Sequence, residues 1–476
     1  MKTTLPQAAA NKTPIYIDAA WAKAIPAKKD DCRFACFVTI TTHFFGRRGG
    51  LNGGQRLREI RAGFESAFWI ANVTELFERL SYYAQSAVLA IFLHESLRFS
   101  DSQTGQLMGW FGFAVWFLPV LGGSLADRFG FRRSLLFAYL ILTAGYFLMG
   151  SLESAWLAPF RERLPLYWLV LAVLMVPALG PSLVKPVVAG TTARASAESV
   201  RSIGYSIYYT LVNVGGVLGP LVAYQVRNSF GIENVFRASA IFVFAMFWVT
   251  LLFYREPSRA DEKPVPSVAT ALKNMLTVLA NFRFVVFLLI FSGFWVMFWQ
   301  EFIALPLFLR GYVDPNAKTD LLLLVDPATV IALQILLSYA TRKLQSFTSM
   351  TLGIVITSAS WLILAANPTT RFAIVALFVL ALGEILQSAR YYEYVSRLAP
   401  PGQQGTYMGY AFLPVAIGYF VAGWLGGFLV HYFGEVLRRP EQMWWVISAI
   451  GFLTALALWI YNLVAKPAVV ADTSGI

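Results

Sequence analysis

Long apolar runs alternate with short polar segments along most of this chain. Runs of about 20 residues, the length that an α-helix needs to cross the hydrocarbon core of a bilayer, recur throughout. They lie at 67–93, 104–126, 134–152, 166–190, 202–225, 237–254, 284–309, 320–340, 347–366, 372–396, 405–430 and 443–464. The pattern predicts an all-α membrane protein with twelve transmembrane helices, arranged as two six-helix bundles.

The longest polar break falls between the sixth and seventh runs and divides the predicted helices into two halves. It contains prolines and an amphipathic stretch, 272–279, which we expect to lie on the membrane surface. The predicted parts are a disordered basic extension 1–64, an N-terminal bundle 65–254, a cytoplasmic loop 255–283, a C-terminal bundle 284–464 and a tail 465–476. The extension has an apolar piece too short to span and unlike a signal peptide. A start codon assigned too far upstream would also account for such an extension.

Composition and charge agree with a membrane protein. Hydrophobic residues make up 57% of the 476 positions and charged residues only 13%, which is too apolar for a soluble globule. The net charge of +12 could suggest nucleic acid, but the basic residues cluster before Glu65 and in short loops between apolar runs. Their excess on one side predicts a multi-pass protein of the cell membrane with both termini in the cytoplasm.

Ionisable residues are rare inside the apolar runs, which makes the few that occur there candidates for function. A charge in the bilayer core costs about 2.5–3.5 kcal/mol on insertion scales, so it is retained where it pairs or lines a water-filled path. In the first run, TELFERLSYY places Glu75, Glu78 and Arg79 on one helical face. A lone Lys185 lies in the fourth run, and we expect Glu75 or Glu78 to be its partner. Such a cluster can exchange a proton as a unit, as an ion-coupled carrier requires.

The loop after the second run, GGSLADRFGFRR at 122–133, combines a tight glycine turn with charges. Asp127 is placed to pair with arginines or helix ends at the cytoplasmic face, and Arg128 is held inside. The loop resembles the signature G-x-x-x-D-R-x-G-R-R of the major facilitator superfamily, in the place where that superfamily carries it. After the eighth run, SYATRKLQS is a degenerate counterpart, as expected for diverged halves.

Within that superfamily the chain resembles the proton-dependent oligopeptide transporters, from about residue 65 to 463. TELFERLSYY resembles the first-span E-x-x-E-R-F-x-Y-Y of that family, and the Lys-Pro at 185 resembles its fourth-span K-P. GYSIYYTLVNVGGVLGP resembles its fifth-span F-S-x-Y-Y-x-x-x-N-x-G. GEILQSARYYEYVSRLAPPGQQGTYMG resembles its tenth-span G-E-x-x-x-S-P, followed by K-L-A-P and G-x-x-M-G. Several separate motifs together make the resemblance specific.

The resemblance implies uptake of di- and tripeptides by alternating access, driven by an inward proton gradient. The proton-coupling residues that it implies are Glu75, Glu78, Arg79 and Lys185, and the substrate-binding residues are Tyr82, Tyr83, Tyr209, Asn213, Trp299, Gln300 and Glu384. Glu384 would face the amino group of the peptide. Opposite charges at the two ends of a central cavity suit a zwitterion. The partners would be short peptides, protons and the lipid bilayer, bound by a monomer without nucleic acid, cofactor or metal.

Several positions depart from the pattern of that family. Ser86 stands where the family has a first-span arginine, and Trp299 where it has a seventh-span acid, while Glu301 faces another side of the helix. The eighth-span Asn-Pro begins with Asp326, and the tenth-span Ser-Pro has lost its proline and is followed by Arg390. The usual arginine and acid can close the outer gate as a salt bridge. Because both are absent, we expect this gate to close by packing of Trp299 and neighbouring aromatics and not by an ion pair.

Other functions stay open beside peptide transport. An integral-membrane enzyme would need a nucleophile, metal ligands or a cofactor motif, but His43, His94 and His431 are scattered and Cys32 and Cys36 form no complete motif. A membrane sensor that keeps the carrier fold without transport is a second alternative. Within transporters, the alternative is a facilitator carrier for another small solute, such as an amino-acid derivative or an organic ion.

Overall fold

The computed structural model describes residues 62–120, 126, 128–198, 200–257, 278–398 and 404–465. These residues are almost entirely helical, and they contain no strand beyond one isolated bridge between Phe64 and Ser196. The all-α prediction is therefore confirmed. The basic extension up to residue 61, most of the amphipathic stretch 272–279 and Asp127 lie outside the described residues.

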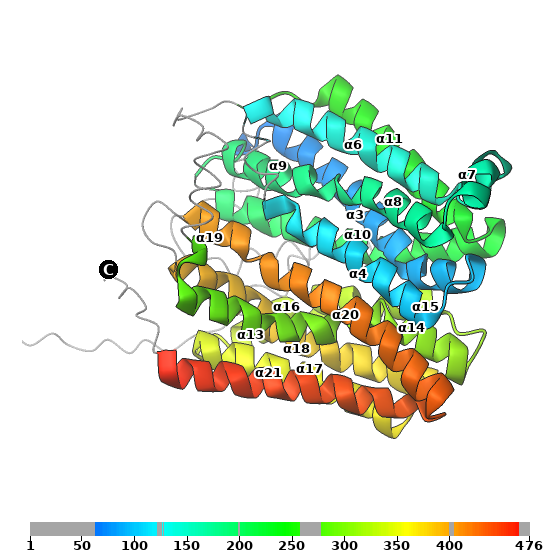
Figure 1. The fold of residues 1–476 in the computed structure, drawn as a ribbon. Helices are drawn as coiled ribbons and strands as arrows, with labels where there is room; N and C mark the ends of the chain where they lie inside the picture. The colour runs from blue at the N-terminus through cyan, green and yellow to red at the C-terminus, as the bar shows by residue number, and fades with distance from the viewer. Residues whose placement is uncertain are drawn as a thin grey trace, which may run out of the picture. The chain divides into compact units, whose positions relative to one another are not determined.

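The described helices form two successive sets along the chain (Figure 1). The N-terminal set consists of α3 (Ser66–Ile91), α4 (Asp101–Phe117), α6 (Phe131–Met149), α7 (Ala158–Arg163), α8 (Leu166–Ala178), α9 (Pro181–Arg194), α10 (Arg201–Phe230) and α11 (Glu233–Phe253). The C-terminal set consists of α13 (Phe282–Phe298), α14 (Ala304–Phe308), α15 (Thr319–Leu322), α16 (Val325–Ala340), α17 (Ser346–Ala366), α18 (Thr370–Leu398), α19 (Gln404–Tyr410), α20 (Leu413–His431) and α21 (Met443–Ala465).

Short 3-10 and π segments join or extend these helices. They are η2 (Phe92–Ser96), η3 (Ala155–Leu157), η4 (Trp299–Glu301), η5 (Leu309–Val313), η6 (Tyr432–Val436) and η7 (Pro440–Gln442). Local sequence sets several helix ends: Ser100 and Gln103 form a capping box at the start of α4. Gly231 follows the end of α10 with a φ of 96°, a conformation that glycine adopts without steric cost.

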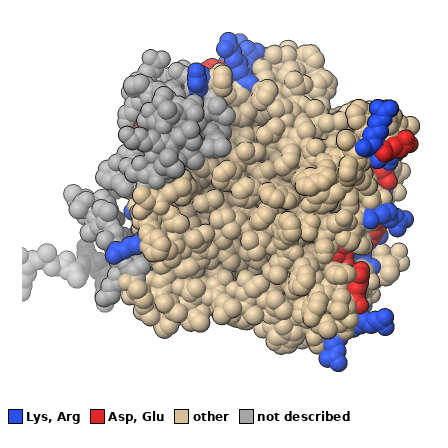
Figure 2. Space-filling model, viewed as in Figure 1, with Lys and Arg blue, Asp and Glu red and all other residues tan. Residues whose placement is uncertain are grey.

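The number of membrane-spanning helices agrees with the predicted twelve. Ten helical segments of the described chain are long and apolar enough to cross a bilayer. The remaining two are α3, which is 26 residues long but contains Glu75, Glu78 and Arg79, and α4, which is described over 17 residues. In Figure 2 the charged side chains lie at two opposite ends of the molecule, and the flank between them is free of charge. A flank of this kind fits the hydrocarbon core of a bilayer, so the chain is a multi-pass membrane protein.

The two sets meet at a seam where α4 packs against α20. Gly105 and Gly109 on α4 face Gly423 and Gly427 on α20, and a Cβ on Gly105 would collide with the Gly423 carbonyl oxygen. Small residues therefore let the two helix backbones touch, as in other membrane helix pairs. This seam lies toward the end of the molecule at which α3 ends and α4 begins, on the right in Figure 1. We call that end distal and the opposite end proximal.

The second pair of helices that joins the sets, α10 and α16, is in contact toward the distal end. Gly216 in the middle of α10 packs against Pro327, at the start of α16. Toward the proximal end of α10, Tyr205 and Tyr209 are 43% and 39% exposed. The contacts described here therefore join the sets toward the distal end, and Tyr205 and Tyr209 toward the proximal end of α10 are exposed.

Candidate substrate and proton site

The first-span motif forms a buried charge cluster in the middle of α3. Arg79 binds Glu78 with two hydrogen bonds, Nε to Oε2 at 2.5 Å and Nη2 to Oε1 at 2.6 Å. Glu75 lies one turn earlier, with Oε1 3.5 Å from Arg79 Nε. The three side chains are 2% exposed or less. The structure thus brings together the first three predicted proton-coupling residues, and both oxygens of Glu75 accept no hydrogen bond from the described residues.

Glycines of α10 let this helix cross closely over the charge cluster of α3. A Cβ on Gly215 would lie 2.7 Å from the Cβ of Arg79, and a Cβ on Gly219 would meet the Leu80 carbonyl oxygen at the same distance. The fifth-span motif VNVGGVLGP therefore lets α10 cover α3 directly, which shields the Arg79 ion pair from lipid and water. Shielding of this kind strengthens an ion pair once it has formed.

Lys185 takes a different place from the predicted one. Its Nζ lies 3.4 Å from the ring centroid of Trp116 on α4 and 5.8 Å from that of Phe412. It forms no ion pair with the described residues, so the expected direct partnership with Glu75 or Glu78 is wrong in this conformation. The reason is that Arg79 already occupies Glu78, while the aromatic face of Trp116 offers the ammonium a cation–π contact.

Aromatic side chains from both sets meet next to the lysine. Trp299 packs against Trp116 of α4 and Tyr419 of α20, with ring centroids 5.8 and 4.3 Å apart. Tyr82 and Tyr83 form an edge-to-face pair at 5.4 Å on α3. Trp299 therefore packs against residues of both sets, and its predicted role in closing the outer gate stays a prediction.

Two further predicted residues near this junction, Ser86 and Gln300, form hydrogen bonds within the protein. Ser86 is 3% exposed and accepts a hydrogen bond from Gln85 Nε2 at 2.9 Å. Gln300 donates to the carbonyl oxygens of Val296 at 3.0 Å and Ala422 at 3.2 Å, which ties η4 to α20. The structure therefore places Gln300 against a neighbouring helix, and its predicted contact with substrate is not part of this arrangement.

Tyr209 and Glu384, two of the remaining predicted binding residues, line a small cavity between α10, α16 and α18. Its lining consists of Tyr209, Val330, Gln334, Glu384, Ile385, Ser388 and Ala389. Asn213 lies one turn after Tyr209 and donates to its carbonyl oxygen at 2.9 Å. Arg390 turns away from Glu384 and pairs with Glu393 at 3.0 Å. Arg390 therefore forms its ion pair with Glu393, and the predicted contact of Glu384 with the substrate stays a prediction.

Asp326 and Glu301, at two of the unusual positions, also lie in this region. Both are buried, at 8% and 1% exposure, and each carboxyl has oxygens that receive no hydrogen bond from described residues. Glu301 lies close enough to Asp326 and Glu384 for their charges to interact. Sequence reasoning noted the two residues only as departures, since nothing in their local spacing shows that they meet.

The loop motif after α4 is described only in part. Arg128 is exposed, and Asp127 lies outside the described residues, so its predicted pairing stays a prediction. Glu256, which follows α11, accepts hydrogen bonds from the backbone N–H groups of Phe131 at 2.7 Å and Arg132 at 2.9 Å. A carboxylate at the start of α6 neutralises the positive end of the helix dipole, so Glu256 fixes this end of α6.

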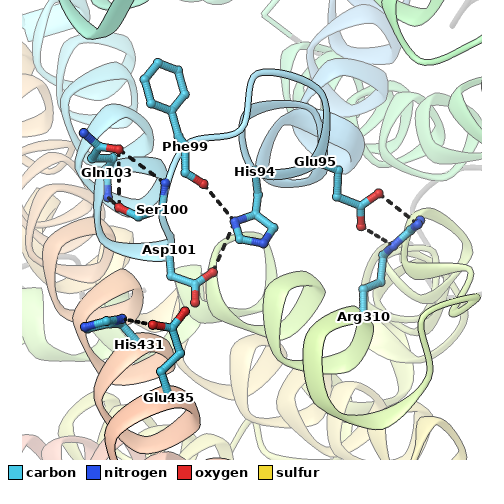
Figure 3. Close-up of polar contacts among 9 residues, drawn as sticks. All are labelled: His94, Glu95, Phe99, Ser100, Asp101, Gln103, Arg310, His431 and Glu435. Carbon is cyan, nitrogen blue, oxygen red and sulfur yellow. Dashed lines mark hydrogen bonds and ion pairs between the residues drawn. The ribbon is translucent and has the colours of Figure 1, made fainter.

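Two ion pairs that the sequence did not predict bridge the sets at the distal end. Arg310 of η5 binds Glu95 of η2, with Nε 2.7 Å from Oε1 and Nη2 3.0 Å from Oε2 (Figure 3). Arg227 of α10 binds Asp320 of α15 at 2.9 Å. These pairs lie away from Ser86 and Trp299, so the prediction about the outer gate stays a prediction. The partners lie 215 and 93 positions apart, and no local pattern reveals such pairs.

The two described histidines lie at the same distal corner. His94 Nδ1 is 3.4 Å from Asp101, and His431 Nδ1 is 2.8 Å from Glu435. Figure 3 shows both carboxyl groups in the space between the two imidazole rings, one from each helix set. The described part of the chain nevertheless contains no group of three or more His, Cys, Asp or Glu placed to hold a metal ion.

Together these features define a class of protein. A bundle of membrane-spanning helices encloses charged side chains at mid-depth, as in a membrane transporter. The sequence profile of the Major Facilitator Superfamily matches residues 73–422, and the chain belongs to that superfamily. It is therefore a transporter of the major facilitator type.

Curated relatives of this chain are described as multidrug transporters. Multidrug resistance protein MdtH of Aeromonas salmonicida (strain A449) is 26% identical over 76% of this chain and 88% of its own length. The protein of that name from Yersinia pestis (strain Pestoides F) is 24% identical over 80% of this chain and 91% of its own length.

Solved structures of similar fold are peptide transporters of the POT family. One, a POT family transporter in complex with a thioalcohol-conjugated peptide, has a TM-score of 0.69 at 15% identity and covers 83% of this chain and 96% of its own. Another, the POT family transporter PepTSo, has a TM-score of 0.67 at 20% identity and covers 84% and 98%. A POT family transporter in complex with 5-aminolevulinic acid gives 0.67 at 15% identity over 83% and 96%. The resemblance predicted from the motifs is confirmed at the level of fold.

Proposed function

We propose that this protein is a proton-coupled carrier of small solutes that bear a protonated amine, with di- and tripeptides as its substrates. The observation that carries the proposal is the α3 cluster, in which one arginine serves two carboxyls and Glu75 keeps both oxygens without a hydrogen bond. A carboxyl in that position can gain or lose a proton without breaking the Arg79–Glu78 pair. Proton binding at Glu75 can therefore couple to movement of the two helix sets.

In this proposal the distal end faces the outside and both termini lie in the cytoplasm. The α4–α20 seam and the two ion pairs would then close the outer side of the carrier. A peptide carboxylate would approach Lys185 and Arg79, and its amino group would approach Glu384 in the opposite set. We propose that the protein works as a monomer in the cell membrane.

The test is uptake by the purified protein in liposomes. With an acidic outside, a labelled dipeptide should accumulate above its external concentration, and a protonophore should abolish the accumulation. Dipeptides should compete with the label, whereas their N-acetylated forms should compete weakly. Binding of dipeptides without any uptake would identify a sensor instead.

A second candidate function is transport of organic cations. Two observations favour it: the curated relatives are multidrug resistance proteins, and Glu301, Asp326 and Glu384 of the C-terminal set form no ion pair with the described residues. The same liposomes distinguish the two functions. Accumulation of a cationic dye with no competition by dipeptides would support the second function and exclude the first.

A further inference from the structure

A cavity of about 590 Å³ lies at the proximal end of the C-terminal set. It is bounded by the α16–α17 connection (residues 341–345), the start of α17 and the ends of α18 and α21, and α21 ends there on the left in Figure 1. It shares no lining residue with the cavity beside Glu384. The side chains that make it a candidate site are basic or polar: Lys343, Gln345, Ser346, Arg390, Arg397 and Asn462. The proposed function assigns no role to any of them.

Positive charge is in excess in this cavity. Glu393, the one carboxyl of the described lining, binds two arginines, with Oε2 3.0 Å from Arg390 Nη1 and Oε1 2.6 Å from Arg397 Nη2. Lys343 forms no ion pair with the described residues. Three basic side chains and one carboxylate leave two positive charges without a counterion in the described lining. The cavity therefore attracts an anion.

The start of α17 adds hydrogen-bond donors to the same space. α17 begins at Ser346, and Gln345 in the N-cap position forms no side-chain hydrogen bond with the helix. The first N–H groups of a helix have no partner within it, and their partial positive charge favours anions. Ser346 and Phe347 line the cavity, so this end of the helix and the basic side chains act on the same ligand.

The arrangement of the donors suits a phosphate group. The lining donors come from the α16–α17 connection, α17, α18 and α21, so they approach an anion from several directions. The oxygens of a phosphate group point in several directions, whereas a carboxylate accepts hydrogen bonds in one plane. Guanidinium groups also bind pairs of phosphate oxygens, and a lysine adds a point charge.

The position of the cavity favours a lipid as the source of the phosphate. Asn462 lies in its wall, and the next two side chains on α21, Leu463 and Val464, are 53% and 79% exposed. Such exposed apolar side chains at the end of a membrane-spanning helix contact lipid, so acyl chains reach the edge of the cavity. In the proposed orientation this end faces the cytoplasm, where anionic lipids are enriched and basic pockets between helices bind their headgroups.

We propose that the cavity binds a phosphate group, supplied by the headgroup of an anionic lipid. The phosphate lies between Lys343 and Arg397 at the start of α17, and Glu393 stays paired with Arg390. Arg390 Nη2 also donates to the Thr341 carbonyl oxygen at 3.4 Å, which connects α18 to the α16–α17 connection. A bound headgroup adds a second contact between these elements and stabilises the proximal end of the C-terminal set. The inference goes beyond the proposed function, because the lipid is bound and not transported.

The first test compares two lipids with the same acyl chains. Dioleoylphosphatidylglycerol is anionic, whereas the choline group of dioleoylphosphatidylcholine cancels the charge of its phosphate. Native mass spectrometry of the full-length protein, titrated with each lipid in detergent, gives both affinities. We expect the wild type to bind the phosphatidylglycerol about tenfold more tightly or better, since each basic side chain near a lipid phosphate contributes about fivefold.

Variants distinguish this site from nonspecific attraction. Lys343→Gln and Arg397→Gln should each weaken binding of the phosphatidylglycerol by about fivefold. Glu393→Gln should strengthen it by about threefold to fivefold, because loss of this carboxylate releases two arginines for the phosphate. A purely structural role of these ion pairs predicts the opposite sign. Arg439→Gln, which removes an exposed arginine of the distal end, is the matched control and should bind the lipid as the wild type does.

Inorganic phosphate separates the two sources of the group. Thermal unfolding of the delipidated wild type is measured in phosphate and in chloride at equal ionic strength. An equal unfolding temperature in both salts supports the lipid as the source, whereas stabilisation by phosphate that is lost in Lys343→Gln would keep the phosphate site but overturn the lipid. Equal affinity for the two lipids without such stabilisation, or weaker lipid binding in Glu393→Gln, would overturn the site. No transported solute enters these measurements, so their outcome is independent of the proposed function.

Discussion

The charge cluster of α3 and three carboxyls of the C-terminal set, Glu301, Asp326 and Glu384, are two solutions to the same problem, namely keeping carboxyls at the middle of a membrane. In α3, Arg79 lies beside Glu75 and Glu78 on one helix, within one turn. The three carboxyls of the C-terminal set come from three segments, η4, α16 and α18, and no described cation pairs with them.

The difference teaches how the two regions divide the work. A cluster that contains its own arginine has its charges paired without a ligand. Proton binding to it can therefore be coupled to a small rearrangement of its side chains. A group of carboxyls without a cation is incomplete until a proton or a ligand arrives, because an unpaired charge in the membrane is costly. We therefore expect loss of Arg79 to destabilise the protein. Substitution of the carboxyls of the C-terminal set should instead change mainly the binding of ligands.

The largest expected effect is on stability. Arg79→Leu leaves Glu78 and Glu75 buried without the guanidinium, and removal of one partner of a buried pair typically costs about 3–5 kcal/mol. Glu301→Gln removes a charge that has no partner, so it should leave stability unchanged or raise it. Thermal unfolding of both variants in detergent measures the contrast. An equal decrease in the unfolding temperature of both variants would mean that pairing with a cation does not distinguish the two regions.

The next effect is on coupling. Glu78→Gln and Lys185→Ala should each reduce accumulation driven by a pH gradient by about tenfold or more, whereas counterflow exchange without a gradient should fall by less than about threefold. The reason is that these side chains belong to the proton-coupling cluster and lie away from the amino-group site. Glu435→Gln, an exposed carboxyl of the distal end, serves as the control. Full gradient-driven uptake by both variants would remove the α3 cluster from the coupling mechanism.

A smaller effect is expected on affinity. Glu384→Gln replaces the ionised acceptor of a charge-assisted hydrogen bond, a contact worth about 1.5–3 kcal/mol, so binding of dipeptides with a free amine should weaken by about tenfold to a hundredfold. N-acetylated dipeptides should bind the variant and the wild type alike. Thermal shifts in the presence of each peptide provide the measurement. An equal loss for both peptides would indicate a structural role for Glu384.

The smallest effect concerns the distal ion pairs, which both helix sets share. Arg310 and Glu95 are 18% and 39% exposed, and partly exposed pairs contribute about 0.2–1 kcal/mol. Arg310→Gln should therefore raise opening of the distal end by about twofold to fivefold, and high salt should produce the same change in the wild type. The rate of labelling of Ser86→Cys, in a background without Cys32 and Cys36, reports the opening. Arg439→Gln, an exposed arginine of the same end, is the control, and a similar rise in that variant would make the effect nonspecific.

The sequence was a good guide wherever the signal is local. Apolar runs predicted the spans, because the length of an α-helix in a bilayer depends on consecutive residues. Spacing on one helix predicted that Glu75, Glu78 and Arg79 meet. The resemblance singled out Glu384, and the structure leaves this residue beside a cavity.

The errors arose where helices from distant parts of the chain meet. Lys185 lies on Trp116 because α9 and α4 cross there, which spacing within one span does not reveal. Glu95 and Arg310 are separated by most of a helix set and pair only after the sets have packed. His94 and His431 looked scattered for the same reason, yet they share one corner of the distal end (Figure 3).

The glycine seam between α4 and α20 has a consequence for energy conservation. At Gly105, Gly423 and Gly427 the two backbones touch, and no space is left there for a file of water molecules. A carrier that is open on the proximal side exposes its carboxyls to one compartment only while the other face resists proton leakage. Close backbone contact supplies that resistance without polar groups that could relay a proton. The proton gradient is then dissipated only through a complete transport cycle, because the seam blocks the flow of protons across the closed end of the carrier.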